Sequence, residues 1–288
     1  MKHKKPAASI TLSMVLLLSA CTIEITIPTV EPTKQGWMES VAADIVFYSD
    51  REGSDDVYIL RTERNEVIRL TDGTSENFFP SWSPDGSRVA FLSDRDGDLD
   101  LYVADVDTHD VRNLSNNDLD DWGPFSWSPD STRLAFDPYI SASSREIYIV
   151  DVSDGKLTPL TDNEVSESDP VWSPDGHRIA YTSVKQGVHG LTIMELQTGQ
   201  TTPLLVDERW ITGLDWSPDG DWIVFEASRQ DGTPRIDVIK VDGSERYASI
   251  CGDLAAGNAV WSTQGDWIAF VGGPVDSGLS QLFIVKKD

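Results

Sequence analysis

The stretch "PSWSPDGSRVAFLSDRDGDLDLYVADVD", residues 80–107, decides the fold because its beginning recurs along the chain. The five-residue turn WSPDG, or a variant of it, starts at five tryptophans, which are Trp82, Trp127, Trp172, Trp216 and Trp261. Their spacings are 45, 45, 44 and 45 residues. Intervals this regular indicate one supersecondary unit that is repeated.

Each unit has the pattern of a set of short β-strands. A run of apolar, β-branched and aromatic residues follows every turn, as in SRVAFLS at 87–93, and ADIVFYS at 43–49 supplies a further copy ahead of the first turn. Alternating runs such as DLYVADV at 100–106, and short strands closed by polar turns, complete about four strands per unit. Six such units predict an all-β fold, a six-bladed β-propeller of four-stranded blades over residues 44–288.

The recurring turn has a physical logic. Proline presets φ, aspartate bonds the local backbone, and the final glycine accepts a positive φ before the next strand. Ser131 stands at that glycine position after Trp127, so we expect a strained or altered turn there. The tryptophans are large enough to fill the space between adjacent sheets, and we expect them to act in packing rather than in ligand binding.

The stretch 80–107 resembles the repeat of the TolB-type, WD-like propeller family, and the likeness covers residues 44–288. The resemblance implies a six-bladed propeller that is used mainly for binding other proteins. The partner expected from it is an envelope protein or a peptide, and we expect the chain itself to be a monomer.

The first residues have the pattern of an export signal. Residues 1–20 have a basic start and an apolar run that is too short for a permanent membrane span. Leu18-Ser19-Ala20-Cys21 resembles the lipobox of bacterial lipoproteins, and this resemblance implies cleavage before Cys21 and a lipid on its thiol. We therefore expect an exported protein that is lipid-anchored at a bacterial membrane, on its periplasmic or extracytoplasmic face. A cleaved signal with a chance cysteine is the alternative.

Residues 21–43 are then expected to form the lipidated N-terminus and a linker. The last blade lacks a fourth strand in the sequence pattern, and the alternating segment 23–30 is long enough to supply it and close the ring. A loose tether with no strand is the other reading, which Pro28 and Pro32 support.

The charge of the chain restricts its partners. The formal net charge is −25, and cleavage after residue 20 would make it −28, because that segment holds three lysines and no acids. Nucleic acid and anionic lipid would be repelled, so we expect no nucleic-acid partner. A well-solvated surface and a basic partner both remain consistent with such a charge.

The loops that join one blade's outer strand to the next blade's inner strand should gather at one face, around a central channel. We call this side the mouth face. Its acids and aromatics suit a basic peptide, because acids steer the encounter and aromatics supply contact area. The alternative is that the aromatics are buried and the acids merely solvated. The candidate binding residues are Glu76, Phe78, Asp120, Asp121, Trp122, Glu167, Asp169, Asp207, Glu208 and Trp210.

Catalytic motifs are absent from the sequence. It has no G-x-S-x-G elbow, and His109, His177 and His189 fall at unrelated blade positions. We therefore expect no enzyme activity and no cofactor. The alternative is a carbohydrate-active or peptidase-like propeller enzyme that uses the acidic mouth.

A calcium loop is the last candidate. Asp94, Asp96 and Asp98 alternate around Gly97, but this glycine is fourth in the run where a helix–loop–helix calcium loop has it sixth, and strands flank the run. We expect a hairpin between a blade's second and third strands, with a calcium-dependent scaffold as the alternative.

Overall fold

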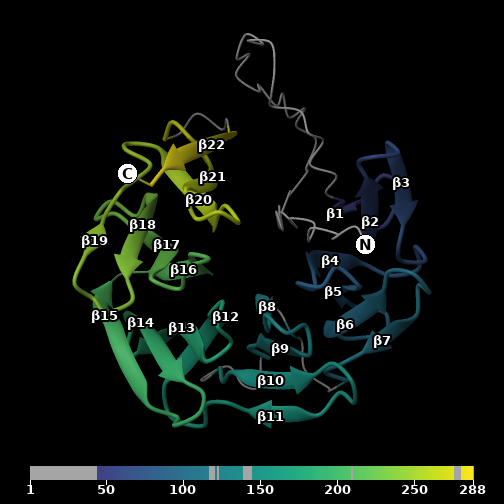
Figure 1. The fold of residues 1–288 in the computed structure, drawn as a ribbon, viewed down its shortest axis with the longest axis horizontal. Coiled ribbons are helices and arrows are strands. Elements are labelled where there is room, and N and C mark those ends of the chain that lie inside the picture. The colour runs from purple at the N-terminus through teal and green to yellow at the C-terminus, as the bar shows by residue number, and fades with distance from the viewer. Residues whose placement is uncertain are drawn as a thin grey trace, which may run out of the picture.

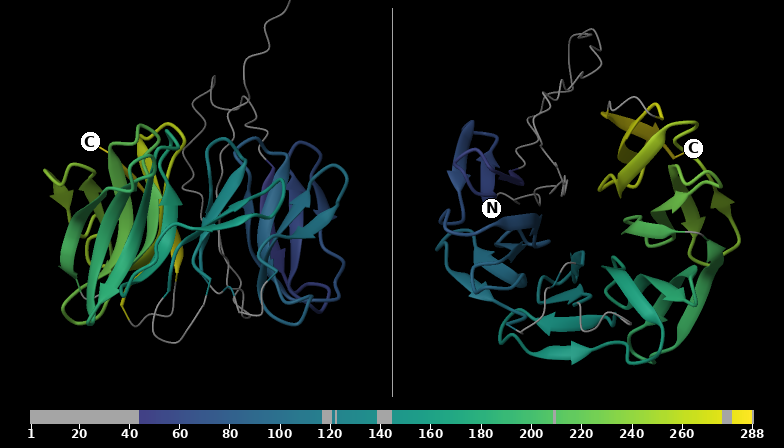
Figure 2. Two further views of the ribbon diagram at one scale, coloured as in Figure 1. Left: turned by 90° about the horizontal axis from the view of Figure 1, so that it is seen from below. Right: turned by 180° about the vertical axis from the view of Figure 1, so that it is seen from behind.

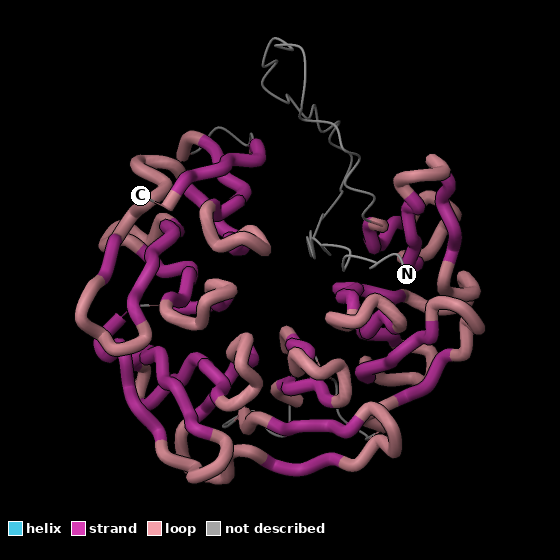
Figure 3. The backbone as a smooth tube through the Cα atoms, in the orientation of Figure 1, coloured by secondary structure: helices cyan, strands magenta, loops and turns pink. Residues whose placement is uncertain are grey.

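The computed structural model describes residues 44–116, 121, 123–138, 145–208, 210–275 and 280–287. All of its regular elements are β-strands (Figure 3). They form six antiparallel sheets that follow one another around a common axis (Figures 1 and 2). The predicted all-β, six-bladed propeller is therefore confirmed. The described residues contain no helix with the length and apolar character that a membrane span requires.

The four middle blades have four strands each, ordered from the axis outward (Figure 1). Blade two holds β4 (Asn77–Trp82), β5 (Arg88–Ser93), β6 (Asp100–Asp105) and β7 (Val111–Asn113). Blade three holds β8 (Phe125–Trp127), β9 (Arg133–Phe136), β10 (Tyr148–Asp151) and β11 (Leu157–Pro159). Blade four holds β12 (Ser166–Trp172), β13 (Arg178–Lys185), β14 (Val188–Glu195) and β15 (Thr201–Glu208). Blade five holds β16 (Ile211–Trp216), β17 (Trp222–Ser228), β18 (Pro234–Lys240) and β19 (Arg246–Tyr247).

The first and last blades have three strands each within the described residues. Blade one consists of β1 (Ile45–Ser49), β2 (Asp56–Arg61) and β3 (Glu66–Arg69). Blade six consists of β20 (Ala255–Trp261), β21 (Trp267–Gly273) and β22 (Gln281–Lys286). Cys21 and the segment 23–30 lie outside the described residues, so lipidation and ring closure stay predictions.

The repeated tryptophans lie between neighbouring blades. Trp216 is buried, and its indole Nε1 donates a hydrogen bond to the Val171 carbonyl of blade four over 3.2 Å. The Arg178 guanidinium of blade four lies over its ring, 4.9 Å from the centroid. Trp127 repeats the first contact by donating to the Ser81 carbonyl of blade two over 3.2 Å. Trp127 and Trp216 therefore join two sheets by apolar area and by one directed bond, whereas the indole nitrogens of Trp82, Trp172 and Trp261 are buried without a partner among the described residues.

The turns explain the five-residue motif. In blade two the Ser83 hydroxyl donates to Asp85 Oδ1 over 2.7 Å, and Gly86 has a φ of +72°. Ser131 adopts the same left-handed conformation with a φ of +61°, which costs a side-chain-bearing residue more than glycine. Its hydroxyl accepts a hydrogen bond from the Asp85 backbone N–H over 3.0 Å, so the strained serine ties blade three to blade two.

Candidate functional site

Four inner strands have a β-bulge, which lies three residues before the tryptophan. The residue in the bulge has a positive φ in every case, as Phe79 (51°), Asp169 (54°), Gly213 (61°) and Asn258 (54°) show. A bulge interrupts the ladder and redirects a side chain, and bulges are frequent beside functional sites. Here they open the sheets beside the central axis.

Two carboxyl side chains from second strands enter these openings. Glu226 of β17 lies against Gly213 and Gly257, where a Cβ atom would come within 3.0 Å and 2.9 Å of its carboxyl oxygens. The Asn258 backbone N–H donates to Glu226 Oε1. Since side chains at either glycine would displace the carboxyl group, the small residues of β16 and β20 make room for Glu226 between blades five and six.

Asp137 takes the equivalent place in blade three, directly after β9. Its carboxyl lies so close to Gly123 that a Cβ atom there would overlap it. Arg145 Nη1 is 3.2 Å from Asp137 Oδ2, whereas Oδ1 is buried and receives no hydrogen bond from the described residues. Asp137 is 1% exposed. A buried carboxyl oxygen without a hydrogen-bond donor lowers the stability of the folded protein. We infer from this that Asp137 has a role other than stabilising the fold.

Asp169, in the bulge of blade four, lies between these two groups. The Thr212 hydroxyl donates to its Oδ2. Its charge raises the pKa of both Asp137 and Glu226, so the three groups interact electrostatically. We refer to Asp137, Asp169 and Glu226 as the axial carboxyl cluster.

Burial is the main reason why the pKa of every member is raised, for Asp137 well above its usual range. Arg145 opposes the rise at Asp137 and at Asp169. Among the described residues it is the cation that opposes the rise, so the cluster places three carboxyl groups opposite one guanidinium. A cation that reached the cluster would favour the ionised carboxylates and would be held by them.

A second carboxyl pair lies at the boundary of blades three and four. Burial raises the pKa of Glu167 to about 7, and the neighbouring Glu146 carboxyl adds to the rise. Asn163 Nδ2 donates to Glu167 Oε1 over 2.8 Å, and the Asn163 backbone N–H donates to Glu146 Oε1 over 3.1 Å. The other carboxyl oxygen of each glutamate is buried and receives no bond from the described residues. The Glu167 carboxyl therefore takes up a proton at a pH well above that of an exposed glutamate.

The remaining predicted mouth-face residues have different surroundings, or are described only in part. Phe78 packs on Tyr48 and Phe79, with ring centroids 6.0 Å and 6.2 Å away. Glu76 Oε2 accepts from the Asp55 backbone N–H over 2.9 Å, which ties it to blade one. Asp121 is buried, whereas Trp210 is 38% exposed. Asp207 and Glu208 are described in their backbone only, within β15, and Asp120 and Trp122 lie outside the described residues.

Sequence reasoning missed Asp137, Glu226, Arg145 and Glu146. A signal for the first two was present, because RLAFD and WIVFE place an acid where RVAFL and RIAYT place leucine and threonine. An acid inside an otherwise apolar buried strand requires either a partner or a function. The pairing of Arg145 with Asp137 and of Glu146 with Glu167 depends on inter-strand geometry that the sequence does not give.

The predicted calcium candidates are held by protein groups. Asp94 Oδ1 accepts from the Glu76 backbone N–H over 2.9 Å, and Asp96 accepts from the Tyr102 hydroxyl. Within the described ranges no group of three or more histidine, cysteine or acidic side chains is arranged to hold a metal ion. The stretch forms the hairpin between β5 and β6, where its sequence placed it.

These features define a class, a six-bladed β-propeller whose axis is lined by buried acids. A family model described as the TolB beta propeller domain matches residues 41–125 and 123–286. The chain belongs to this family, and the predicted family resemblance is confirmed.

Individual relatives agree on the fold. TolB from Acinetobacter baumannii superposes with a TM-score of 0.66 and 17% identity over 84% of this chain and 61% of that chain. A puromycin-hydrolysing peptidase from Mycobacterium tuberculosis superposes with a TM-score of 0.65 and 14% identity over 84% of this chain and 42% of that chain. In sequence, the uncharacterized peptidase YuxL of Bacillus subtilis (strain 168) is 26% identical over 148 residues, which are 48% of this chain and 20% of YuxL. The chain thus spans less than two thirds of each of these three proteins.

Proposed function

We propose that this protein is a non-catalytic propeller of the bacterial cell envelope that is lipid-anchored through Cys21 and binds a basic segment of another envelope protein at its mouth face. The observation that carries the proposal is the axial carboxyl cluster, three buried acids from successive blades that face one arginine and would carry net negative charge once a bound cation favours their ionisation. Its partner class follows from this charge, since a lysine or arginine side chain is the group that it would attract.

The position of the cluster supports binding from the mouth face. Asp137 follows the second strand of its blade, at the end where the blade-to-blade loops lie. Asp169 and Glu226 keep 8% and 9% of their surface exposed, which leaves a narrow approach for one cationic group. Buried charges attract more strongly than charges in water, so even one inserted cation would contribute substantially to affinity.

Substitution of Asp169→Asn together with Glu226→Gln tests the binding role. The amides keep the shape of the buried carboxyl groups and remove only the charge that they would carry against a cation, so they should leave the fold intact. We expect the mature protein to capture an envelope protein by cross-linking in intact cells and the double variant to lose it. Glu63→Gln with Asp107→Asn changes the net charge equally at exposed sites and should retain the partner. Equal capture by both double variants would contradict the assignment.

The anchor has a separate test. We expect the full chain with Cys21→Ser to leave the membrane fraction of the cells, whereas the unaltered chain remains there, because several acyl chains bind a bilayer far more strongly than the protein surface would. The lipid anchor would be contradicted if the variant stayed in the membrane fraction and mass spectrometry found no lipid on Cys21 of the unaltered chain.

A second function is favoured by the peptidases among the relatives, one similar in fold and one in sequence. In this alternative the acidic mouth performs acid–base chemistry on a peptide or a saccharide. Asp121→Ala, Glu167→Ala and Asp169→Ala would then abolish a hydrolase or lyase activity of the purified protein. Turnover that survives all three substitutions would reject this alternative.

A further inference from the structure

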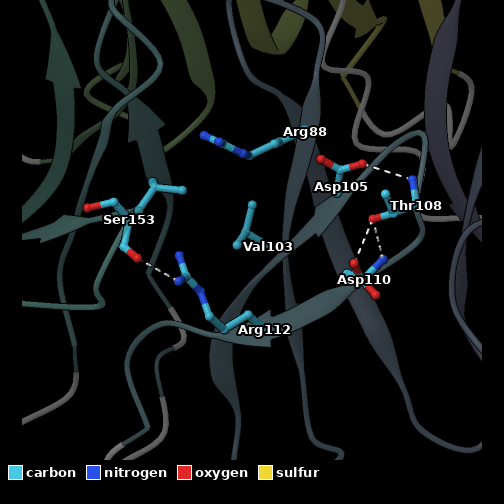
Figure 4. A pocket seen from close by; sticks show the side chains of 8 residues that line it. Arg88, Val103, Asp105, Thr108, Asp110, Arg112 and Ser153 are labelled. Atoms are coloured by element: carbon cyan, nitrogen blue, oxygen red, sulfur yellow. Dashed lines mark hydrogen bonds between the residues drawn. The ribbon is translucent and has the colours of Figure 1, made fainter.

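A pocket of about 410 Å³ lies between blades two and three, away from the axial carboxyl cluster. In an antiparallel blade the turn between the first and second strands and the turn between the third and fourth lie at the same end, opposite the blade-to-blade loops. The pocket is built at that end, which we call the turn face. Its lining residues are Arg88, Val103, Asp105, Thr108, Asp110, Arg112, Val152 and Ser153 (Figure 4).

Arg88 differs from the arginines at the same repeat position in the next two blades. Arg133 and Arg178 lie over Trp172 and Trp216, with the guanidinium 4.7 Å and 4.9 Å from the ring centroids. Each is also within ion-pair distance of the aspartate in its own turn, at 3.9 Å and 3.1 Å. Arg88 has neither contact within the described part of the chain, and its side chain extends into the pocket (Figure 4).

The Asp85 turn has the same local bonds as the Asp130 turn of blade three and one further bond to Ser131. Asp85, the turn aspartate that corresponds to the ion-pair partners of Arg133 and Arg178, accepts hydrogen bonds from Ser83, from the Ser87 hydroxyl and from the Ser87 backbone N–H. Its own backbone N–H is held by the Ser131 hydroxyl over 3.0 Å. The Asp85 turn is therefore fixed by uncharged groups and by blade three, without a close contact to Arg88.

The acids of the pocket are also engaged locally. Asp105 Oδ1 accepts from the backbone N–H groups of Asp107 and Thr108 over 3.0 Å and 2.9 Å. Asp110 Oδ2 accepts from the Thr108 hydroxyl over 2.8 Å. Both carboxylates thus complete the turn between β6 and β7 (Figure 4), and Asp105, the cross-strand partner of Arg88, also interacts with the charge of that guanidinium.

Arg112 supplies a second guanidinium. One of its nitrogens, Nη1, donates to the Ser153 carbonyl over 2.8 Å, which fixes the side chain across the boundary to blade three. Within the described residues its other N–H groups make no hydrogen bond, and they lie beside the pocket. The buried side chains of Val103 and Val152 supply the apolar part of the lining.

We propose that this pocket binds a carboxylate, the terminal carboxylate or acidic side chain of a small ligand or peptide. Guanidinium groups match a carboxylate through paired charge-assisted hydrogen bonds. Two arginines and two aspartates make the pocket neutral before binding, so a singly charged carboxylate fits it better than a doubly charged phosphate. The site is independent of the proposed mouth-face function, because it has the opposite charge preference and lies at the opposite end of the blades.

The test uses N-acetylglycine as the probe in a nuclear magnetic resonance titration of the mature chain, with N-acetylglycinamide as its uncharged match. We expect saturable shifts at residues 103–112 and 152–153 with the acid and none with the amide. Arg88→Gln should weaken binding by about tenfold or more, as expected when a charge-assisted hydrogen bond of about 1.5–3 kcal/mol is lost. Arg133→Gln, at the equivalent repeat position, should bind as the parent does.

Three results would overturn the proposal. These are equal shifts with the amide, unaltered affinity of the Arg88→Gln variant, and tighter binding of inorganic phosphate than of the carboxylate at the same residues. Amide spectra of both arginine variants that match the parent elsewhere would show that the fold is retained.

Discussion

Replacing Trp216 with alanine is expected to lower the free energy of unfolding by about 3–5 kcal/mol, the range for large aromatic side chains in protein cores. The indole is buried between blades four and five, in a cluster with Leu214 and Phe225. Its loss removes this apolar area, the hydrogen bond to the Val171 carbonyl and the surface on which Arg178 lies. Urea unfolding followed by circular dichroism measures the effect.

Trp210 provides the control, because it is the same residue type at 38% exposure. Trp210→Ala should change the free energy of unfolding by less than about 0.5 kcal/mol, as surface substitutions usually do. Similar losses for the two variants would show that the repeated tryptophan is not the packing element between blades.

The second large effect concerns pH. Burial raises the pKa of Glu167 in the folded protein from 4.5 to about 7, so the folded state keeps a proton that the unfolded chain releases near pH 4.5. Stability must therefore fall as pH rises through this window, since the folded state binds more protons than the unfolded state. The contribution of Glu167 is fully present below about pH 4.5 and is lost above about pH 7, a change of about 3 kcal/mol at 1.36 kcal/mol per pKa unit.

Glu167→Gln removes this proton and retains an oxygen that can accept from Asn163. We expect the variant and the parent to have similar stability at pH 4.5, and the variant to be more stable by about 3 kcal/mol at pH 8. Glu195→Gln, at an exposed position, should show no such difference. Parallel pH profiles of the parent and the Glu167→Gln variant would mean that Glu167 ionises normally in the fold.

The fold was predictable because the signals that specify it are local and repeated. WSPDG-type turns, buried runs such as RVAFLS and their 44–45-residue spacing each depend on neighbours in the chain, so six blades follow without long-range information. Ser131 also followed this logic, since a missing glycine predicted an altered turn and its φ is +61°.

The site was harder because it is assembled between blades. Asp169 and Glu167 were among the predicted mouth-face acids, but the sequence grouped them with Asp121 and Trp210 rather than with Asp137, Glu226 and Glu146. The cluster exists because bulges at glycines 213 and 257 admit a side chain from a second strand. Such a bulge changes the register by one residue, and an alternating pattern alone does not reveal it.

Acidic residues in loops and acidic residues in buried strands have different roles in this fold. Acids such as Asp94 and Asp96, which are conspicuous in the sequence, complete turns and hairpins. Asp137 and Glu226 stand alone within apolar runs and contribute to the cluster. A single acid in a buried strand was therefore a stronger indication of a site than a run of acids in a loop, because only the former must overcome desolvation.

The most direct test of the central claim is calorimetric titration of the mature protein with a lysine-containing peptide and with the same peptide acetylated on its lysines. We expect binding of the unmodified peptide only, tighter at pH 8 than at pH 5.5 because a higher pH favours the ionised form of carboxyl groups whose pKa is raised by burial, and at least about tenfold weaker in the Asp169→Asn, Glu226→Gln variant. Equal affinity for both peptides, or an unchanged affinity of the double variant, would contradict it.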